Sequence, residues 1–415
     1  MLRSSINGCF NFPNSCTLSK HGFVPWMEVQ RQQQLSIQDH HGCTINPLRP
    51  PSKHIIKRTN FGSINCNNET KLSIYQNYSV LNERKNIVQR QSLPFTIEPG
   101  FTDDDDNITT LVTNLYKQLN VLYRFSRPHT IIGTFIGVTS VSLLPIESVA
   151  DLSLEFFMGL LKALVPSILM NIYVVGLNQL FDLHIDKVNK PDLPLASGEF
   201  TMGVGSMIVS ICCLLSFGIG YASQSPPLFI ALLTSFFLGS AYSVDLPMLR
   251  WKKQPFLAAA CIVIVRAMVV QLAFFIHMQK YVLGKPIILT RSVIFATAFM
   301  CFFATVIALF KDLPDVDGDK HFGIQSFSIT LGKEKVFWLC IKMLLAAYGS
   351  ALALGASSPS LPVKLAIVLG HSALAAILLM RAQSVDLADN ASITSFYMFI
   401  WKLFYAEYLL IPLIR

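Results

Sequence analysis

The sequence is poor in charge. Charged residues make up only 14% of its 415 residues, against roughly a quarter in an ordinary soluble chain. Hydrophobic residues make up 52%, which argues against a single soluble domain. Apolar segments of about 20 residues, the length that crosses a hydrocarbon core roughly 30 Å thick, recur from residue 130 to the C-terminus. We therefore expect a polytopic membrane protein.

Cysteines in a metal-binding or disulfide pattern are also lacking. Four of the nine cysteines precede residue 90, and the other five lie within apolar segments. Neither set has the spacing of a zinc site or a disulfide framework. Cys212 and Cys213 are expected to pack as a small hydrophobic pair.

Acidic residues are scarce in the first 90 residues, which hold eleven Lys and Arg against four Asp and Glu. A basic leader of this kind, rich in hydroxyl and amide groups and without a continuous apolar stretch, is typical of an organelle transit peptide. A disordered basic tail is the alternative. Because the rest of the chain is nearly neutral, with 22 bases and 21 acids, we expect no nucleic-acid partner. The predicted division is a leader (1–90), a linker with an interfacial helix (91–127) and a membrane domain (128–415).

An amphipathic helix is predicted directly before the membrane domain. Apolar residues recur at helical spacing over 108–123, after an acidic run from Asp103 to Asp106. Such a helix would lie on the membrane surface, with the aspartates at its positive N-terminal end. A solvated linker is the alternative explanation for those aspartates.

Nine apolar segments are long enough to be membrane helices, and mostly short connections join them. This pattern predicts an all-α bundle of nine transmembrane helices. The segments are 130–146, 157–181, 203–222, 227–244, 255–277, 290–311, 334–355, 363–381 and 394–414.

Counting the helices places four polar loops on one side of the membrane. The loops after the second, fourth, sixth and eighth segments lie on the same side as the leader, and the C-terminus lies on the other side. The positive-inside bias assigns the more basic loops to the stroma or matrix. That side carries Lys187, Lys190, Arg250, Lys252, Lys253, Lys320, Lys333 and Arg381, whereas the opposite loops carry Lys280, Lys285, Arg291 and Lys364.

Two carboxylate motifs end the second and sixth segments. Asn178, Asp182 and Asp186 are spaced four apart, so they share one helical stripe. Asp315 and Asp319 repeat this spacing, and Pro314 and Gly318 would loosen the helix there. The two helices run in the same direction, which suggests an internal parallel repeat.

Bringing these carboxylates together at one end of the bundle is unfavourable unless a cation binds between them. Oxygen ligands without Cys or His favour Mg²⁺, which is typically shared with substrate phosphates. Interspersed lysines would suit an anionic ligand such as a diphosphate. Solvated loop acids are the alternative for one such motif, but two of matching spacing on one side favour a binding site. The acids are Asp182, Asp186, Asp312, Asp315, Asp317 and Asp319, and the lysines are Lys187, Lys190, Lys311 and Lys320.

These motifs resemble the UbiA superfamily of intramembrane prenyltransferases, over about residues 120–415. Further stretches resemble its plant plastid branch, which contains homogentisate phytyltransferases and aromatic prenyltransferases. They are Arg127-Pro-His-Thr130, 189–198, Tyr242-Ser243, 249–252 and 322–326.

The resemblance implies nine helices around a central cavity open to lipid, with two Mg²⁺ ions holding a prenyl diphosphate. One ion would be bound by Asn178 and Asp182 and the other by Asp315 and Asp319. Asp186 would bind an ion directly or contact one of its ligands, and Asp312 is a further candidate ligand. The expected diphosphate contacts are Arg127, Lys190, Lys252, Lys311 and Lys320.

The reaction expected from this resemblance is Mg²⁺-dependent transfer of a prenyl group, preferably dimethylallyl, to a ring carbon of a flavonoid, coumarin or phenylpropanoid in a plastid membrane. Homogentisate phytyl transfer is the alternative. Phe181, His184 and Asp192 depart from the phytyltransferase pattern, which speaks against that alternative. An ion-coupled transporter is a rival of another class, although its acids would be expected near the bilayer midplane.

A few polar residues lie inside the apolar segments. Arg266 is costly to insert in a membrane, so we expect an ion pair or hydrogen bond in the bundle, with a substrate contact as the alternative. Asn171 would line the cavity or bond to a neighbouring helix. His371 and Glu407 are expected to pack or pair. His184 projects away from the stripe of its motif, which indicates a surface role.

Overall fold

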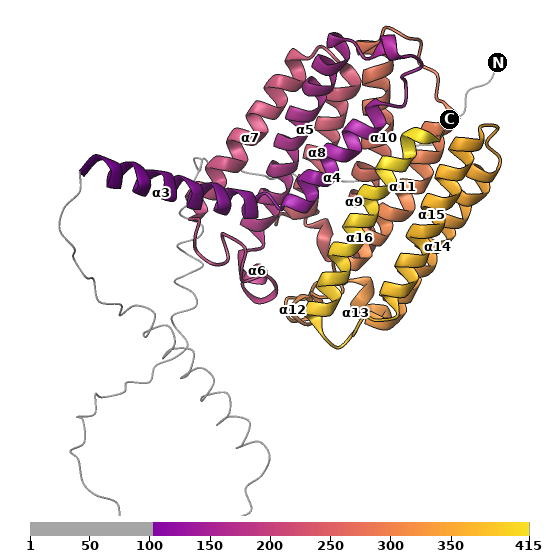
Figure 1. Cartoon of the computed structure of the whole chain (residues 1–415). Helices are drawn as coiled ribbons and strands as arrows, with labels where there is room; N and C mark the ends of the chain where they lie inside the picture. Colours follow the sequence, from indigo (N-terminus) through magenta and orange to yellow (C-terminus); the bar gives the residue numbers. More distant parts are fainter. Residues whose placement is uncertain (1–102, 415) are drawn as a thin grey trace, which may run out of the picture. The chain divides into compact units, whose positions relative to one another are not determined.

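The computed structural model describes residues 103–414. The predicted leader and most of the predicted linker lie outside these residues. Within the described range every regular element is helical, and eight helices are long and apolar enough to cross a membrane. The predicted all-α membrane bundle is therefore confirmed (Figure 1).

Each of the nine predicted segments corresponds to a helix. α4 (Pro128–Ser142), which corresponds to 130–146, is shorter than expected and is the one predicted segment not among the eight candidate spans. The eight are α5 (Leu154–Phe181), α7 (Met202–Ala222), α8 (Pro226–Ser243), the fifth segment (Pro255–Val282), α11 (Arg291–Phe310), α14 (Lys333–Ala356), α15 (Leu361–Ala382) and α16 (Asn390–Leu410) with its 3-10 extension η6 (Ile411–Leu413).

The fifth segment is not a uniform α-helix. It consists of α9 (Pro255–Val263), the π-helical turn η4 (Ile264–Val269), α10 (Val270–Ile276) and a second π-helical turn, η5 (His277–Val282). π-helical turns insert an extra residue per turn and frequently occur at functional sites. Neither turn could be read from the apolar pattern.

Both motif helices end close to the predicted ends of their segments, so neither motif lies on one continuous helix. α5 ends at Phe181, and a short helix, α6 (Leu183–Asn189), follows it. α11 ends at Phe310, and α12 (Val316–His321) follows after a turn around Pro314. The loosening expected at the second motif is present, and a similar break follows Asp182. The motif carboxylates thus extend from helix ends into two short helices at the mouth.

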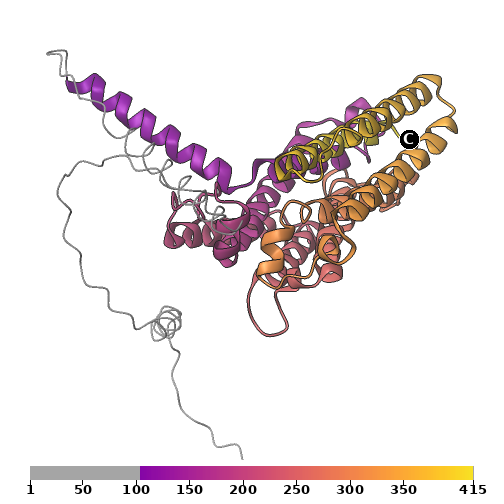
Figure 2. The same cartoon turned by 90° about the horizontal axis from the view of Figure 1, so that it is seen from below.

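Packing of aromatic and aliphatic side chains closes the bundle. The main core joins α11, α14 and α16 through buried Phe303, Phe310, Phe337 and Phe404. α16 also packs against α4 (Figure 2). There, Ser140 Oγ donates a 2.5 Å hydrogen bond to the carbonyl of Tyr408. The first and last helices of the membrane domain are therefore neighbours.

The predicted amphipathic helix is α3 (Asp103–Phe125). Its C-terminal end is anchored by buried Val121 and Phe125, which join a second core with α5 and α7. The apolar residues before this anchor stay exposed, as expected for an interfacial helix, although its position on a membrane remains a prediction. The exposed apolar residues are Leu111, Val112, Leu115, Tyr116 and Leu119.

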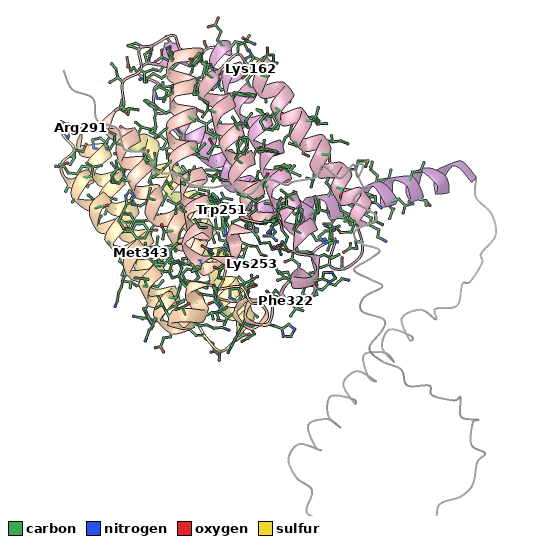
Figure 3. The ribbon with its side chains drawn as sticks, turned by 180° about the vertical axis from the view of Figure 1, so that it is seen from behind. Lys162, Trp251, Lys253, Arg291, Phe322 and Met343 are labelled. Atoms are coloured by element: carbon green, nitrogen blue, oxygen red, sulfur yellow. The ribbon has the colours of Figure 1, made fainter. Side chains whose placement is uncertain are left out.

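The four polar loops meet at one end of the bundle, as the helix count predicted. Asn189 after α6 contacts Asp319 in α12, and Gln325 donates its backbone N–H to the carbonyl of Lys253. Lys333, at the start of α14, donates to Asn390 at the start of α16. The C-terminus lies at the opposite end (Figure 1), and Figure 3 shows Lys253 and Phe322 far from Lys162 at that opposite end.

Candidate active site

Asp182 is the most heavily contacted acid of the first motif. It caps α5 and is 3% exposed. Asn178 Nδ2 donates a 2.6 Å hydrogen bond to Oδ2 of Asp182, Lys252 Nζ lies 2.5 Å from the same oxygen, and Arg250 Nη2 lies 3.0 Å from Oδ1. Two cations therefore neutralise the buried carboxylate, as buried charges require.

Arg250 was not among the predicted site residues. It is buried in the left-handed region at φ 61°, and its Nη1 donates a 2.9 Å hydrogen bond to the carbonyl of Ser243. Its guanidinium also reaches the carbonyl of Phe181, so it ties the end of α8 to the end of α5. The resemblance over 249–252 singled out Lys252 as a diphosphate contact and not Arg250.

The second motif meets the segment that follows the first. Asn189 Nδ2 donates a 3.2 Å hydrogen bond to Oδ1 of Asp319, and Lys190 forms an ion pair with Asp315. Gly318 makes this approach possible, since a Cβ atom there would lie 1.8 Å from Oδ1 of Asn189. The second motif is thus in direct contact with the segment that follows the first motif, and Asn189 is a further residue that the sequence analysis missed.

Lys311 lies between the second motif and helix α8. Its Nζ donates to Asp312 at 2.6 Å and to the Tyr242 hydroxyl at 2.9 Å. Burial by itself would lower the pKa of Lys311, but Asp312 and Tyr242 outweigh it and raise that pKa well above its usual value. Lys311 therefore stays charged, as binding of an anion requires.

Arg127 approaches the first motif from the start of α4. It also adopts a left-handed backbone, with φ 49°, and its Nη2 lies 3.5 Å from Oδ1 of Asn178. This places a third cation near Asn178 and Asp182, at the position the resemblance implied.

Four polar residues of the two motifs point away from this cluster. Asp317 is exposed and lies 3.9 Å from Lys333, and the exposure of His184 agrees with its expected surface role. Lys320 is exposed too, with no hydrogen bond or ion pair to another described side chain, so the structure does not bring this expected diphosphate contact to the others. The exposed residues are His184, Lys187, Asp317 and Lys320.

Asp186 and Asp319 remain able to accept a ligand. Both are buried, and Oδ2 of Asp186 has no hydrogen-bond partner. Burial raises the pKa of Asp186, and burial together with the neighbouring Asp315 raises the pKa of Asp319 to about 7. Positive charge brought by a ligand would compensate these buried acids.

The donor atoms fit Mg²⁺ only if another ligand shares the ion. In the part of the chain that the structure describes, no three acidic, His or Cys side chains converge closely enough to hold a metal alone. Mg²⁺ typically binds one or two carboxylates, keeps waters and takes phosphate oxygens as further ligands. The acids at this end of the bundle come in pairs, which matches that number of carboxylate ligands.

Polar residues within the helices have local partners. Asn171 donates a 2.8 Å hydrogen bond to Thr130, and His371 Nε2 lies 3.1 Å from Glu407, which confirms their expected pairing. Arg266 differs from expectation, because it lies over the Trp401 ring, 4.7 Å from its centroid, and forms no ion pair with a described carboxylate.

The helical bundle brings acids of two motifs and buried cations together at one end, an arrangement suited to a divalent ion and an anionic substrate. The chain belongs to the UbiA prenyltransferase family, whose model matches residues 131–403. The protein is therefore a membrane-spanning enzyme that transfers prenyl groups, and this replaces the alternative of an ion-coupled transporter.

Three plant relatives show how far the likeness extends. The chain is 56% identical to homogentisate phytyltransferase 1, chloroplastic, of Arabidopsis thaliana, over 72% of this chain and 76% of that one. It is 54% identical to coumarin 8-geranyltransferase 1, chloroplastic, of Citrus limon, over 75% and 77%. It is 46% identical to naringenin 8-dimethylallyltransferase 2, chloroplastic, of Sophora flavescens, over 80% of each chain.

Proposed function

We propose that this enzyme transfers a long prenyl chain, phytyl or a C20 relative, from its diphosphate to a ring carbon of homogentisate. The observation that carries this proposal is the 56% identity to a homogentisate phytyltransferase, against 46% to a dimethylallyltransferase that acts on naringenin. The sequence analysis preferred dimethylallyl transfer to a flavonoid, coumarin or phenylpropanoid, and the comparisons favour its alternative.

The departures from the phytyltransferase pattern carry little weight in the folded chain. His184 and Asp192 are exposed, so neither side chain lines the buried cluster. Phe181 contributes its backbone carbonyl to Arg250, a contact that any residue could make. These three positions therefore do not argue against a homogentisate acceptor.

The diphosphate would bind among the cations that surround the two motifs. Lys252, Lys311 and Arg127 lie on three different elements around Asn178 and Asp182, and Arg250 holds Asp182 from behind. Lys190 would have to leave Asp315 to reach the substrate. Charged hydrogen bonds of this kind strengthen as charge develops on a leaving diphosphate.

Asn178, Asp182, Asp186, Asp315 and Asp319 would hold Mg²⁺, with Asp312 nearby. The metal would supply Lewis-acid neutralisation of the diphosphate as it leaves. Among these donors, the partnerless Oδ2 of Asp186 is available without breaking a contact, whereas Asp182 must exchange Lys252 for the ion.

The residues of the bundle then control the fate of the prenyl group. The bond between its C1 and the diphosphate oxygen breaks, a ring carbon of the phenol forms the new bond, and that carbon loses a proton to restore aromaticity. Apolar walls exclude water, which would otherwise capture the allylic cation. Aromatic faces near the mouth, such as Tyr242, could stabilise that cation by roughly 0.5–2 kcal/mol.

A matrix of substrates tests this proposal. Membranes containing the full chain would be supplied with dimethylallyl, geranyl, geranylgeranyl or phytyl diphosphate and with homogentisate, umbelliferone or naringenin, and products would be identified by mass spectrometry. We expect homogentisate with a C20 donor to give the highest turnover. Preferred prenylation of umbelliferone with geranyl diphosphate would instead support the second candidate, for which the 54% identity to the Citrus limon enzyme speaks.

We also propose a plastid membrane, with the two motifs facing the stroma. The relatives named chloroplastic and the basic, acid-poor leader support the compartment, and the basic loops support the orientation. Residues 1–90 fused to a fluorescent protein should enter plastids. In thylakoid or envelope vesicles, a protease should cut the loop after α15 only from the stromal side.

A further inference from the structure

Among the residues that the structure describes, Arg266 has no charged partner, although it lies inside a membrane-spanning segment. It lies in the π-helical turn Ile264–Val269, near the middle of the segment Pro255–Val282. A charge at this depth costs at least about 2.5 kcal/mol, so such residues usually pair or serve a ligand. What surrounds its guanidinium therefore decides its role.

The surroundings of Arg266 are aromatic. Its guanidinium carbon lies 4.7 Å from the centroid of Trp401, and Tyr397, Tyr405 and Tyr408 lie in its neighbourhood. No carboxylate among residues 109–414 lies within 4.0 Å of it. Glu407, the buried acid on the same helix as Trp401, is already paired with His371. Arg266 is half-buried.

An aromatic cluster connects Arg266 to the carboxylate motifs. We define it as His129, Tyr397, Trp401 and Tyr405. The His129 ring lies 5.1 Å from Trp401, and the Tyr405 hydroxyl donates a 2.7 Å hydrogen bond to the carbonyl of His129. Tyr397 has Lys311 and Arg127 as well as Arg266 in its neighbourhood.

The chain on either side of His129 reaches the helix of the first motif. Arg127, two residues before His129, contacts Asn178, and Thr130, directly after His129, accepts the hydrogen bond of Asn171, which lies on the same helix α5 as Asn178. The aromatic cluster thus adjoins the segment that carries Arg127, one of the cations expected at the diphosphate end. A phenol held against these rings could meet the prenyl C1 at one end and the guanidinium at the other.

We propose that Arg266 binds the carboxylate of an acidic phenolic acceptor and so determines specificity for the acceptor. This inference rests on the proposed function, since homogentisate is a hydroquinone with a carboxymethyl group. A guanidinium binds a carboxylate through two parallel hydrogen bonds, and the aromatic cluster would take the ring. A neutral phenol would leave Arg266 unpaired and gain nothing from it.

The test compares acceptors that differ only in charge. The purified full chain would be assayed with homogentisate and with its methyl ester, as the wild-type protein, Arg266→Met and Arg266→Lys. For Arg266→Met we expect KM for homogentisate to rise roughly 30-fold or more, as for truncation of one partner of a buried charge pair, with KM for the ester changed less than about threefold. Arg266→Lys should restore part of the loss.

Lys280→Met provides the matched control, because Lys280 also lies over an aromatic ring, 5.6 Å from the centroid of Tyr281, but in the last turn of the segment. It should leave both KM values unchanged. Equal losses for acid and ester in Arg266→Met would assign Arg266 a structural role and overturn the inference. If Arg266→Met does not fold, Arg266→Lys decides. A ratio of the KM for the ester to the KM for the acid that is the same in Arg266→Lys as in the wild-type protein would overturn the inference as well.

Failure of the proposed function has a different signature. If the wild-type protein does not use homogentisate, the same variants would be assayed with umbelliferone and its 3-carboxylic acid. Selective loss of the acidic coumarin in Arg266→Met would support the inference and refute the homogentisate acceptor. A wild-type preference for the neutral coumarin, unchanged in the variant, would refute both.

Discussion

Asn189 and Asp319 join the two carboxylate motifs, because the side-chain amide of Asn189 donates a 3.2 Å hydrogen bond to Oδ1 of Asp319. The two residues are 130 positions apart in the sequence, on segments that follow α5 and α11. Their contact fixes the spacing between the two halves of the site. It depends on the absence of a side chain at Gly318, directly beside Asn189.

Gly318→Ala should lower turnover strongly without unfolding the protein. The new Cβ would collide with Asn189 and push α12 away from the first motif, and misplacement of catalytic groups by about 1 Å can cost roughly 100-fold in rate. Steady-state kinetics and thermal unfolding in detergent would measure the two effects. Gly349→Ala in α14 is the matched control, since a Cβ there would meet nothing within 4 Å. Unchanged kcat in Gly318→Ala would contradict the assigned contact.

Asp182→Asn and Asp319→Asn should each nearly abolish turnover. Each change would remove a proposed metal ligand from one motif, and every 1.36 kcal/mol of lost transition-state stabilisation is tenfold in rate. If both motifs act on one leaving group, as proposed, the double variant should be little slower than either single variant. Asp317→Asn serves as the control, since Asp317 is exposed. Full activity of either single variant at saturating Mg²⁺ would refute the two-metal assignment.

The Mg²⁺ requirement should fall as the pH rises. The pKa of Asp319 is raised to about 7, so at pH 6 a proton occupies the carboxylate that would bind the ion. The Mg²⁺ concentration for half-maximal activity should therefore be about tenfold higher at pH 6 than at pH 8. Titrations of activity with Mg²⁺ at several pH values would measure it, and a pH-independent requirement would contradict the prediction.

The same shift affects stability in the opposite sense. A carboxyl group whose pKa rises on folding contributes stability that is full below its unfolded pKa of 3.8 and is lost as the pH rises through about 7. With chelator present, the protein should therefore melt at a lower temperature at pH 8 than at pH 6. Asp319→Asn should remove much of this pH dependence.

His371→Leu should destabilise the bundle without a specific effect on the site. It leaves Glu407, which is 0% exposed, without its partner at 3.1 Å, and breaking a buried pair costs about 3–5 kcal/mol. Replacing both residues by Leu should restore much of the loss, because no buried charge then remains. Thermal unfolding of the wild-type protein, the single variants and the double variant would measure these changes in stability. A double variant that is less stable than His371→Leu would show that the pair itself stabilises the protein.

The sequence carries enough information for the bundle because apolar length and helix counting are properties of the chain alone. They predicted the helix at each of nine segments and the gathering of four loops at one end. The early end of α4 at Ser142 and the π-helical turns around Arg266 and Lys280 escaped prediction, since they depend on packing and on local hydrogen bonding.

Spacing likewise found the acids of the site more readily than their partners. Asp182 and Asp186 are four residues apart, and Asp315 and Asp319 repeat this spacing. No such repeat in the sequence predicts Arg250, Asn189 or Tyr242. Their contacts arise from a left-handed turn and from loops far apart in the sequence. Lys320 shows the converse, since its position beside Asp319 in the sequence does not bring its side chain into the cluster.

The compensation of Asp182 is confined to the first half of the bundle. Arg250 and Lys252 follow α8 and lie 3.0 and 2.5 Å from this carboxylate, so the ends of the second and fourth membrane helices carry mutually neutralising charges. The acid therefore has its cationic partners without any residue of the second motif, which lies more than sixty residues further along the chain.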